Sequence, residues 1–405
     1  MRRPPLPRIL LPLRHRDFRL LLIGQTVSSF GNFFFLIAVP FQLIALGASP
    51  IELGITVSIL GLSTLTFMLL GGAIADRVPR RWLILGNDAI GGTVTAIVAI
   101  LAWTGQLRIE HIYVAAAILG VAFAFLLPAY SAIVAELIPP DLLTEANAAR
   151  ALGGTLARTG GPLAAGLVIA FAGTPLAFTV DALTFFISFA LFLLSAPLPR
   201  PAPVEVPILR QVRDGIAFVL RTPWLWMTLV GLTFINVTYG AQRGVMTPLF
   251  VRDSLHQGAA VFGLVTAAFG VGQLIGAFAV AQVRIARPGV AMYAFETLGG
   301  LATLAIGLVI SIPAMLIFMA VMGFALSSSD ALFGAALQRN VPQAMLGRVT
   351  SINFLIGGLL IPVAPILAGD LVDTIGPAAT FVVMGAWAAG LAALLLVVSP
   401  VRALR

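Results

Sequence analysis

The sequence predicts an all-α integral membrane protein with twelve transmembrane helices in two pseudo-symmetric six-helix bundles. The first observation is composition: 60% of the residues are hydrophobic, 10% are charged, and the mean hydropathy is +1.05. These values exclude an ordinary soluble domain. The second observation is a series of twelve apolar stretches, each near the ~20 residues that a helix needs to cross a bilayer. The third is a recurrence of small and acidic residues between the two halves of the chain.

The predicted helices are continuous apolar runs that end near prolines, glycines or arginines. In the first half they cover residues 18–46, 53–75, 82–103, 112–137, 147–171 and 175–196. In the second half they cover residues 224–250, 259–283, 290–312, 314–337, 348–367 and 378–398. The basic, proline-rich segment 1–16 precedes an apolar run that is too long for a cleaved signal peptide, so we expect it to lead into the first helix.

Residues 197–222 form the one long connection between predicted helices. They are predicted to be a cytoplasmic linker between an N-terminal bundle, 1–196, and a C-terminal bundle, 223–405. Five prolines within 197–207 prevent a helix early in the linker. From 208 to 219, apolar residues and arginines fall on opposite faces of a predicted helix. Such a helix lies along a membrane surface.

Four residues of the first half recur in the second at nearly one offset. Gly54, Gly61, Pro79 and Asp88 reappear 208 or 209 positions later, as Gly263, Gly270, Pro288 and Glu296. Chance recurrence of glycine and proline in apolar sequence does not readily produce four such matches. The pattern predicts two parallel repeats with a substrate path between them.

The basic residues predict the topology of the chain. All 24 are arginines, and 19 lie in or beside the termini and alternate connections, whereas Arg108 and Arg252 lie in the opposite set. Because cytoplasmic loops are enriched in positive charge, both termini are expected in the cytoplasm. Because the arginines lie beside apolar runs, we attribute the pI of about 11.2 to contact with membrane lipids rather than to binding of nucleic acid. The chain has no cysteine, which excludes disulfides and thiolate metal sites.

A charged turn between the second and third predicted helices carries a family signature. The turn contains Gly72, Asp76, Arg77, Arg80 and Arg81. It resembles the loop between helices two and three of the major facilitator superfamily, with Pro79 in place of the usual second glycine. The resemblance implies a cytoplasmic gate in which Asp76 faces Arg348 at the start of helix eleven. It also implies that Arg77 reaches Glu136 at the end of helix four.

Further motifs resemble one branch of this superfamily, which holds enterobactin-type siderophore exporters and macrolide efflux pumps. They are Pro128 with Ala132, Ala146-Asn147 at the start of helix five, Gly161-Pro162 with Gly166, and Gly347-Arg348-Val349. The resemblance covers essentially the whole chain. It implies a transporter that works by alternating access, with helices one, four, seven and ten around a central cavity.

Ionisable residues inside the predicted helices are candidate coupling sites, because charge is costly in a membrane. Asp88 and Glu296, near the cytoplasmic ends of helices three and nine, and Asp181 of helix six are interpreted as structural. Asp330 differs, since it lies deep in the cavity helix ten after three serines. Burial favours its neutral form, whereas a nearby arginine favours the ionised form.

Asp330 can therefore carry a proton or form a static ion pair, and the sequence leaves both open. Arg158 of helix five and Arg243 of helix seven are the candidate counter-charges, and either can instead meet an anionic substrate. Asn32 stands where the related branch often has an acid. Because an amide does not titrate, coupling is expected at Asp330, with Asp181 as the next candidate.

The candidates for the substrate cavity are polar or aromatic residues of the predicted helices. They are Gln25, Ser29, Asn32, Phe33, Gln42, Tyr130, Phe234, Asn236, Tyr239 and Ser328. Each aromatic side chain can instead pack against neighbouring helices. A cavity rich in phenylalanine with few polar groups favours small amphipathic organic molecules over sugars.

We therefore expect a monomeric secondary active exporter of drug-like or siderophore-like compounds, a proton antiporter in a bacterial inner membrane, with no cofactor. A Walker loop requires a lysine, which the chain lacks, so ATP-driven transport by this chain is excluded. The three histidines lie outside the deep parts of the predicted helices, and no catalytic or metal-ligating cluster is visible, so an enzyme is not expected. A lipid flippase, an uptake carrier and a non-transporting membrane protein are the alternatives.

Overall fold

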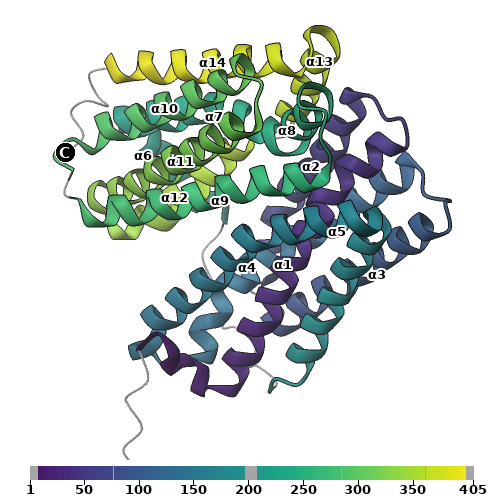
Figure 1. The fold of residues 1–405 in the computed structure, drawn as a ribbon. Helices are drawn as coiled ribbons and strands as arrows, with labels where there is room; N and C mark the ends of the chain where they lie inside the picture. Colours follow the sequence, from purple (N-terminus) through teal and green to yellow (C-terminus); the bar gives the residue numbers. More distant parts are fainter. Residues whose placement is uncertain (1–7, 76, 197–207, 284, 361, 398–405) are drawn as a thin grey trace, which may run out of the picture. The chain divides into compact units, whose positions relative to one another are not determined.

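The computed structural model describes residues 8–75, 77–196, 208–283, 285–360 and 362–397 (Figure 1). Within these residues the regular structure is entirely helical, and the helices are joined by short connections. By their contacts the described residues fall into two compact units. Unit 1 comprises those of Met1–Leu46 and Ile59–Val204, and unit 2 those of Gly47–Ser58 and Glu205–Arg405.

Unit 1 is built from the helices of the first half of the chain. They are η1 (Arg8–Arg14), α1 (Arg16–Ala45), the later part of α2 (Pro50–Ala75), α3 (Arg80–Trp103), α4 (Ile109–Leu137), η2 (Pro140–Leu142) and α5 (Leu143–Leu193). The first residues of α2 belong to unit 2. The predicted domain boundaries at 196 and 223 stay a prediction.

The helix α5 contains two predicted helices and breaks at Gly173. The φ angle of Gly173 is +79°, a left-handed conformation that glycine adopts without steric cost. Residues on both sides of this break reach the same part of α1. A Cβ at Gly161 would lie 2.9 Å from the Phe33 side chain, and one at Gly31 would lie 1.8 Å from Thr184 Oγ1. The chain therefore reverses at Gly173, and both arms of α5 pack on α1.

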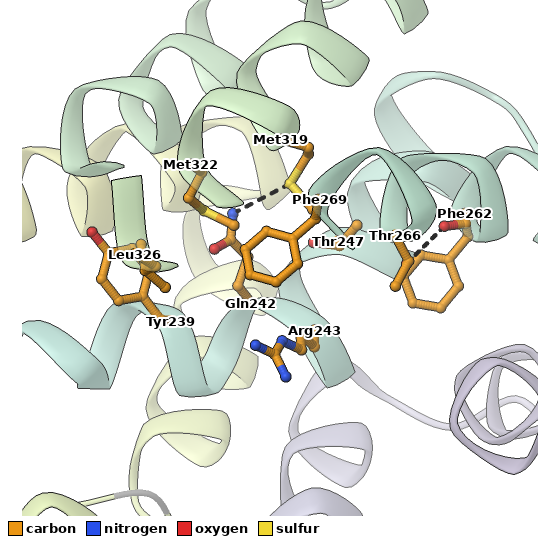
Figure 2. Close-up of a pocket in the computed structure, with 10 residues that line it drawn as sticks. All are labelled: Tyr239, Gln242, Arg243, Thr247, Phe262, Thr266, Phe269, Met319, Met322 and Leu326. Carbon is orange, nitrogen blue, oxygen red and sulfur yellow. Dashed lines mark hydrogen bonds between the residues drawn. The ribbon is translucent and has the colours of Figure 1, made fainter. Parts of the chain in front are cut away.

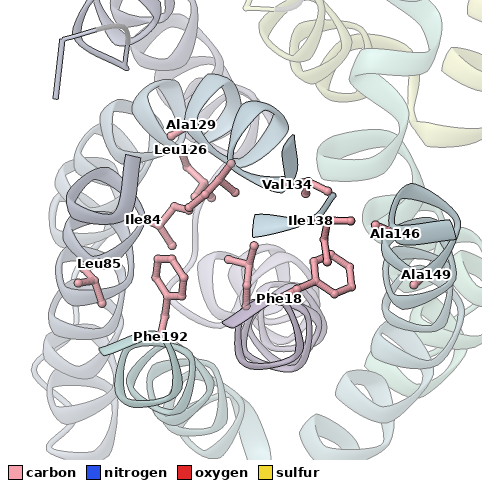
Figure 3. Packing of buried hydrophobic residues seen from close by; sticks show 12 residues of the cluster. Phe18, Ile84, Leu85, Leu126, Ala129, Val134, Ile138, Ala146, Ala149 and Phe192 are labelled. Atoms are coloured by element: carbon pink, nitrogen blue, oxygen red, sulfur yellow. The ribbon is translucent and has the colours of Figure 1, made fainter. Parts of the chain in front are cut away.

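Buried apolar side chains from four helices form the core of unit 1 (Figure 3). They include Phe18 of α1, Ile84 of α3, Ile133 of α4, and Ala146 and Phe192 of α5. Lipid is as apolar as these side chains, so the stabilisation comes from close packing rather than from withdrawal from lipid. The core fixes the relative positions of α1, α3, α4 and α5.

Unit 2 contains the helices of the second half. They are α6 (Ile208–Arg221), α7 (Pro223–Ala241), η3 (Gln242–Met246), α8 (Thr247–Leu249), η4 (Phe250–Ser254), α9 (Ala259–Gln282), α10 (Pro288–Leu308), α11 (Ile312–Asn340), α12 (Gln343–Gly358), α13 (Ala364–Ile375) and α14 (Pro377–Val397). The expected linker helix forms as α6, and the chain bends by 102° where it enters α7. Predicted helix seven contains one π-helical turn, η3, and a second, η4, begins at its last residue, Phe250.

Glycines hold the helices of unit 2 in close contact. A Cβ at Gly272 of α9 would lie 1.9 Å from the Ala320 carbonyl oxygen of α11. A Cβ at Gly300 of α10 would lie 2.4 Å from the Ala389 backbone nitrogen of α14. Small residues let helix backbones approach closely in a membrane, so these two contacts require glycine at the present spacing.

Nine helices within the described residues are long and apolar enough to cross a membrane, or ten if the bent pair at Pro223 is one span. The predicted class, an all-α membrane protein, is confirmed. The number differs from twelve partly because α5 covers two predicted helices and predicted helix eleven is divided between α12 and α13. The count of twelve stays a prediction.

Candidate substrate and coupling sites

The first candidate site is a polar pocket of unit 1 formed by α1, α4 and α5. It is lined by Gln25, Thr26, Ser29, Tyr130, Asn147, Arg150, Ala151, Gly154 and Arg158. Four of these residues, Gln25, Ser29, Tyr130 and Arg158, were predicted from the sequence for the cavity or for coupling. The pocket combines two guanidinium groups with uncharged polar groups, and none of these lining residues is acidic.

One face of α5 supplies most of the pocket wall. Asn147, Ala151, Gly154 and Arg158 follow one another at intervals of three or four residues, which places them on the same side of a helix. Arg150 extends from this helix to α4. Its guanidinium carbon lies 4.1 Å from the ring centre of Tyr130, and its Nη1 donates a 3.5 Å hydrogen bond to Asn147 Oδ1. Cation–π stacking on Tyr130 therefore holds Arg150 in one position.

Asp88 of α3 forms a hydrogen-bond network next to this pocket. Its side chain is completely buried (0% exposed). It accepts hydrogen bonds from Ser188 Oγ at 2.6 Å, Asn87 Nδ2 at 3.2 Å and Gln25 Nε2 at 3.3 Å. Gln25 also lines the pocket, so the network joins the pocket wall to α3 and α5. All three donors are neutral, which suits a structural clamp between helices.

The second candidate site is a pocket of unit 2 beside the π-helix η3 (Figure 2). It is lined by Tyr239, Gln242, Arg243, Thr247, Phe262, Thr266, Phe269, Met319, Met322 and Leu326. Gln242 is buried, and its Nε2 lies 3.8 Å from Met319 Sδ. The Arg243 guanidinium carbon lies 5.1 Å from the ring centre of Phe269. π-Helical turns within α-helices are frequent at functional sites, and η3 here presents Gln242 and Arg243 to one pocket.

Two carboxyl groups and one guanidinium of unit 2 interact at this pocket. Glu296 of α10 is 4% exposed. The Tyr239 hydroxyl donates a 3.4 Å hydrogen bond to the backbone carbonyl of Glu296, and the Glu296 carboxyl interacts electrostatically with Asp330 of α11. Asp330 is exposed and also interacts electrostatically with Arg243. The charged groups of η3, α10 and α11 therefore form one connected cluster.

The charged turn before α3 holds an ion pair and a contact with a helix end. Arg80 forms a salt bridge with Glu136 of α4, and these side chains are 17% and 19% exposed. Arg81 donates a 2.8 Å hydrogen bond to the carbonyl of Leu193 at the end of α5. Arg77 is exposed in the turn, so Arg80 makes the contact with Glu136 that was expected of Arg77. The reason is that Arg80 begins α3, whereas Arg77 precedes it.

The linker helix α6 contacts the start of α12. Arg348 Nη1 lies 3.0 Å from Asp214 Oδ2. A Cβ at Gly215 would lie 2.6 Å from Ile352 Cδ1, so glycine allows the two helices to approach here. Asp76, the expected partner of Arg348, lies outside the described residues. Its contact with Arg348 stays a prediction.

A comparison with known families decides the class of this chain. The family described as "Transmembrane secretion effector" matches residues 8–403. The chain belongs to this family of the major facilitator superfamily. It is 29% identical to the enterobactin exporter EntS of Shigella flexneri, over 84% of this chain and 80% of EntS. It is also 29% identical to EntS of Escherichia coli O81 (strain ED1a), over 84% of this chain and 81% of EntS.

Solved structures share the fold of this transmembrane secretion effector. A bacterial homolog of the human lysosomal transporter Spinster has a TM-score of 0.74 and 13% identity, over 99% of this chain and 98% of its own. A peptide transporter POT has a TM-score of 0.76 and 15% identity, over 96% of this chain and 95% of its own. By its family the chain is a multi-pass membrane transporter of small molecules and not an enzyme, and the solved structures show that it has the major facilitator fold. The predicted superfamily and the resemblance to enterobactin exporters are confirmed.

Several residues predicted for the cavity of this transmembrane secretion effector make packing contacts. Phe33 lies against Gly161, and Gln42 accepts a hydrogen bond from Thr174 at the break of α5. The carbonyl of Phe234 accepts a 3.2 Å hydrogen bond from Trp387 Nε1. Their roles in substrate binding stay predictions.

Other predicted residues lie outside both pockets. Asn32 and Asn236 are half-buried, Gly72 is half-buried near the end of α2, and Ser328 is buried. Asp181 is 1% exposed, and neither of its carboxyl oxygens has a hydrogen-bond partner among the described residues. Its part in proton coupling also stays a prediction.

Five of the nine lining residues of the polar pocket were not predicted for it, namely Thr26, Asn147, Arg150, Ala151 and Gly154. The spacing of residues 147, 151, 154 and 158 was a usable signal, because it marks one helix face. Gln242, Met319 and Met322 of the unit 2 pocket were also missed. Gln242 lies three residues after Tyr239, which was predicted, so helical spacing was a usable signal for Gln242 as well.

Proposed function

We propose that this transporter is a secondary active exporter of small amphipathic organic compounds, siderophore-like molecules among them. Similarity to enterobactin exporters over most of the chain supports export. The pocket of unit 2 by itself combines the polar groups of Gln242 and Arg243 with phenylalanine and methionine side chains. Polar groups with apolar surface match an amphipathic substrate. The transporter acts as a monomer in a bacterial inner membrane and moves its substrate by alternating access.

The cluster of Glu296, Asp330 and Arg243 is the observation that carries proton coupling. Two interacting carboxylates repel each other, and a single bound proton relieves this repulsion. Arg243 balances the charge that remains. The cluster is thus neutral with one proton and carries one net negative charge without it. Asp330 is the exposed member, so it exchanges the proton.

The electrostatic interaction between Asp330 and Arg243 links proton release to substrate movement. Asp330 binds a proton in the outward-facing state from an acidic exterior. Closer approach of Arg243, or substrate bound from the cytoplasm, favours the ionised carboxylate and releases the proton inside. Each pH unit across the membrane is worth ~1.4 kcal/mol, which supports about a tenfold gradient of a neutral substrate in one-for-one exchange.

Transport in everted membrane vesicles tests this proposal. A fluorescent amphipathic dye and a catecholate siderophore are supplied outside vesicles that contain the full chain, with an acidic or a pH-matched interior. We expect accumulation with the acidic interior and its loss on addition of a protonophore, relative to vesicles without the protein. Equal accumulation without a pH difference would exclude proton coupling. Accumulation only in right-side-out vesicles indicates an uptake carrier, and movement of a labelled lipid alone indicates a flippase.

The proposed orientation places both termini in the cytoplasm, in contact with anionic lipids. The asymmetry of the arginines supports it. A fluorescent-protein fusion at the C-terminus should be bright in cells, and an alkaline phosphatase fusion there should be inactive. An active phosphatase fusion would contradict the orientation.

A further inference from the structure

The polar pocket of unit 1 contains two arginines, and the proposed proton coupling involves neither of them. Arg150 and Arg158 both line it, with no acidic residue among the lining side chains. Guanidinium groups stay ionised in proteins. The carboxyl of Asp88 lies nearby but does not line the pocket, and neutral donors from Gln25, Ser188 and Asn87 bind it. The pocket therefore presents two positive charges without a lining acid.

The two arginines of this pocket are held differently. Arg150 is stacked on Tyr130 and hydrogen-bonded to Asn147. Arg158 lies three turns beyond Asn147 on the same face of α5 and is exposed. None of the salt bridges between described residues involves Arg158, and a Cβ at Gly154 would lie 4.0 Å from its Nη2. Arg150 is thus a fixed cation, and Arg158 has an available planar fork of donors.

We propose that this pocket binds the carboxylate of a small hydroxylated organic acid, with Arg158 as its bidentate partner. An arginine fork matches the two oxygens of a carboxylate. Arg150 adds a second positive charge at a fixed position. Ser29, Thr26 and Asn147 supply neutral groups that can bind a hydroxyl beside the carboxylate. This inference rests on the proposed function only in making the acid a transported molecule; the binding step does not depend on it.

Binding of two matched probes to the full chain, dissolved in a non-ionic detergent, tests this proposal. Salicylate and salicylamide have the same ring and hydroxyl, but only salicylate carries a negative charge. Calorimetric titration should show salicylate binding at least ~10-fold more tightly, since hydrogen bonds between charged groups exceed neutral ones. Arg158→Gln should remove this preference and leave salicylamide binding unchanged. Equal binding of both probes by the unaltered chain, or unchanged preference in Arg158→Gln, would overturn the proposal.

Two further variants keep the test decisive. Arg14→Gln makes the same charge change at an exposed position of η1 outside the pocket and should bind salicylate normally. Loss of binding in this variant would show that net charge, not the pocket, controls affinity. Arg158→Lys keeps the charge but not the fork, so its salicylate affinity should fall several-fold. Unchanged affinity in Arg158→Lys would refute the bidentate contact even if Arg158→Gln fails to fold.

Two further experiments identify the source of the ligand and distinguish failure of this proposal from failure of the proposed function. Phosphatidylglycerol added to the detergent supplies a lipid phosphate, and it should not displace salicylate. Displacement that depends on Arg158 would assign the pocket to a lipid headgroup and overturn the organic-acid assignment. Everted vesicles then report transport of salicylate. Charge-selective binding without transport would contradict export of such acids but would still support carboxylate binding in this pocket.

Discussion

The two units carry a buried acid at repeat-related positions, Asp88 in α3 and Glu296 in α10, in different surroundings. Neutral side chains donate three hydrogen bonds to Asp88. Glu296 instead interacts with Asp330, which interacts with Arg243. A carboxylate whose hydrogen bonds come from neutral donors can serve packing, whereas interacting carboxyls can share a proton. The repeat therefore preserves the position of the acid but not its task.

The positive charges of the two units differ in the same way. In unit 1, Arg150 and Arg158 line a pocket that contains no acidic lining residue. In unit 2, Arg243 lies beside Phe269 and interacts with Asp330. We infer that unit 1 recognises the substrate through charge and that unit 2 handles the proton. Each prediction below tests this division of roles between the two units.

The largest expected effect is the loss of pH-driven transport in Asp330→Asn. An amide cannot bind and release a proton in this range, so active accumulation should fall at least ~10-fold. Exchange of internal for external substrate without a gradient should persist, because it needs no net proton movement. Transport assays in proteoliposomes measure both rates. Asp373→Asn, at an exposed position of α13, is the matched control and should retain both. Full pH-driven transport by Asp330→Asn would remove the proposed role of unit 2.

Asp88→Asn is the corresponding change in unit 1 and should affect stability instead. It replaces an acceptor of three hydrogen bonds with an amide that accepts at one atom only, which leaves buried donors without partners. We expect a loss of about 1–3 kcal/mol in the apparent free energy of unfolding in detergent. The ratio of pH-driven transport to exchange should stay at its original value. A lower ratio in the folded variant would show that Asp88 also takes part in coupling.

Replacing a glycine at a helix contact should destabilise unit 2 more than unit 1, and this difference is smaller than the effects above. A Cβ at Gly300 of unit 2 would meet the backbone nitrogen of Ala389 at 2.4 Å. A Cβ at Gly92 of unit 1 would meet the ring of Phe186 at 2.9 Å, and Phe186 is 41% exposed and can move. Gly300→Ala should therefore cost about 1–3 kcal/mol, as overpacking does, and Gly92→Ala less than about 1 kcal/mol. Thermal unfolding of both variants checks the order, and a larger loss in Gly92→Ala would reverse it.

The fold was largely predictable because a bilayer imposes one simple requirement on the chain. Each helix that crosses must hide its backbone polar groups over a long apolar run, and such runs stand out in the sequence. The reversal between predicted helices five and six was also visible, since Gly173 and Pro175 interrupt the apolar pattern. The π-helical turns of residues 242–246 and 250–254 were not, because tertiary contacts rather than composition select them.

The sites were predictable to the extent that they depend on helix faces. Spacing along one helix places Arg158 on the same face as Asn147, whereas the stacking of Arg150 on Tyr130 joins α5 to α4 and has no counterpart in local sequence. A long arginine side chain can reach a partner about one helical turn away or on a neighbouring helix. For that reason the sequence did not distinguish Arg80 from Arg77 as the partner of Glu136, nor reveal Asp214 as a partner of Arg348. Short-range pattern therefore locates the charges, and packing decides their partners.

The smallest expected effects come from two ion pairs near the surface, one chosen from each unit. The Arg80–Glu136 pair of unit 1 is 17% and 19% exposed, and the Arg348–Asp214 pair of unit 2 is 31% and 44% exposed. Water and salt screen exposed charges more strongly. We expect Glu136→Gln to cost about 1 kcal/mol and Asp214→Asn about 0–0.5 kcal/mol of apparent stability.

Double-mutant cycles measured at low salt and in 1 M salt check this order. Arg80→Gln combined with Glu136→Gln, and Arg348→Gln combined with Asp214→Asn, isolate the two interaction energies from other effects of each change. The coupling in unit 2 should vanish in 1 M salt, where the screening length is only about 3 Å. Part of the coupling in unit 1 should remain, because its charges are less accessible to ions. If the Arg348–Asp214 coupling is the larger and survives salt, the linker helix is bound more firmly than its exposure implies. In that case the Arg80–Glu136 pair of unit 1 would not be the stronger of the two ion pairs.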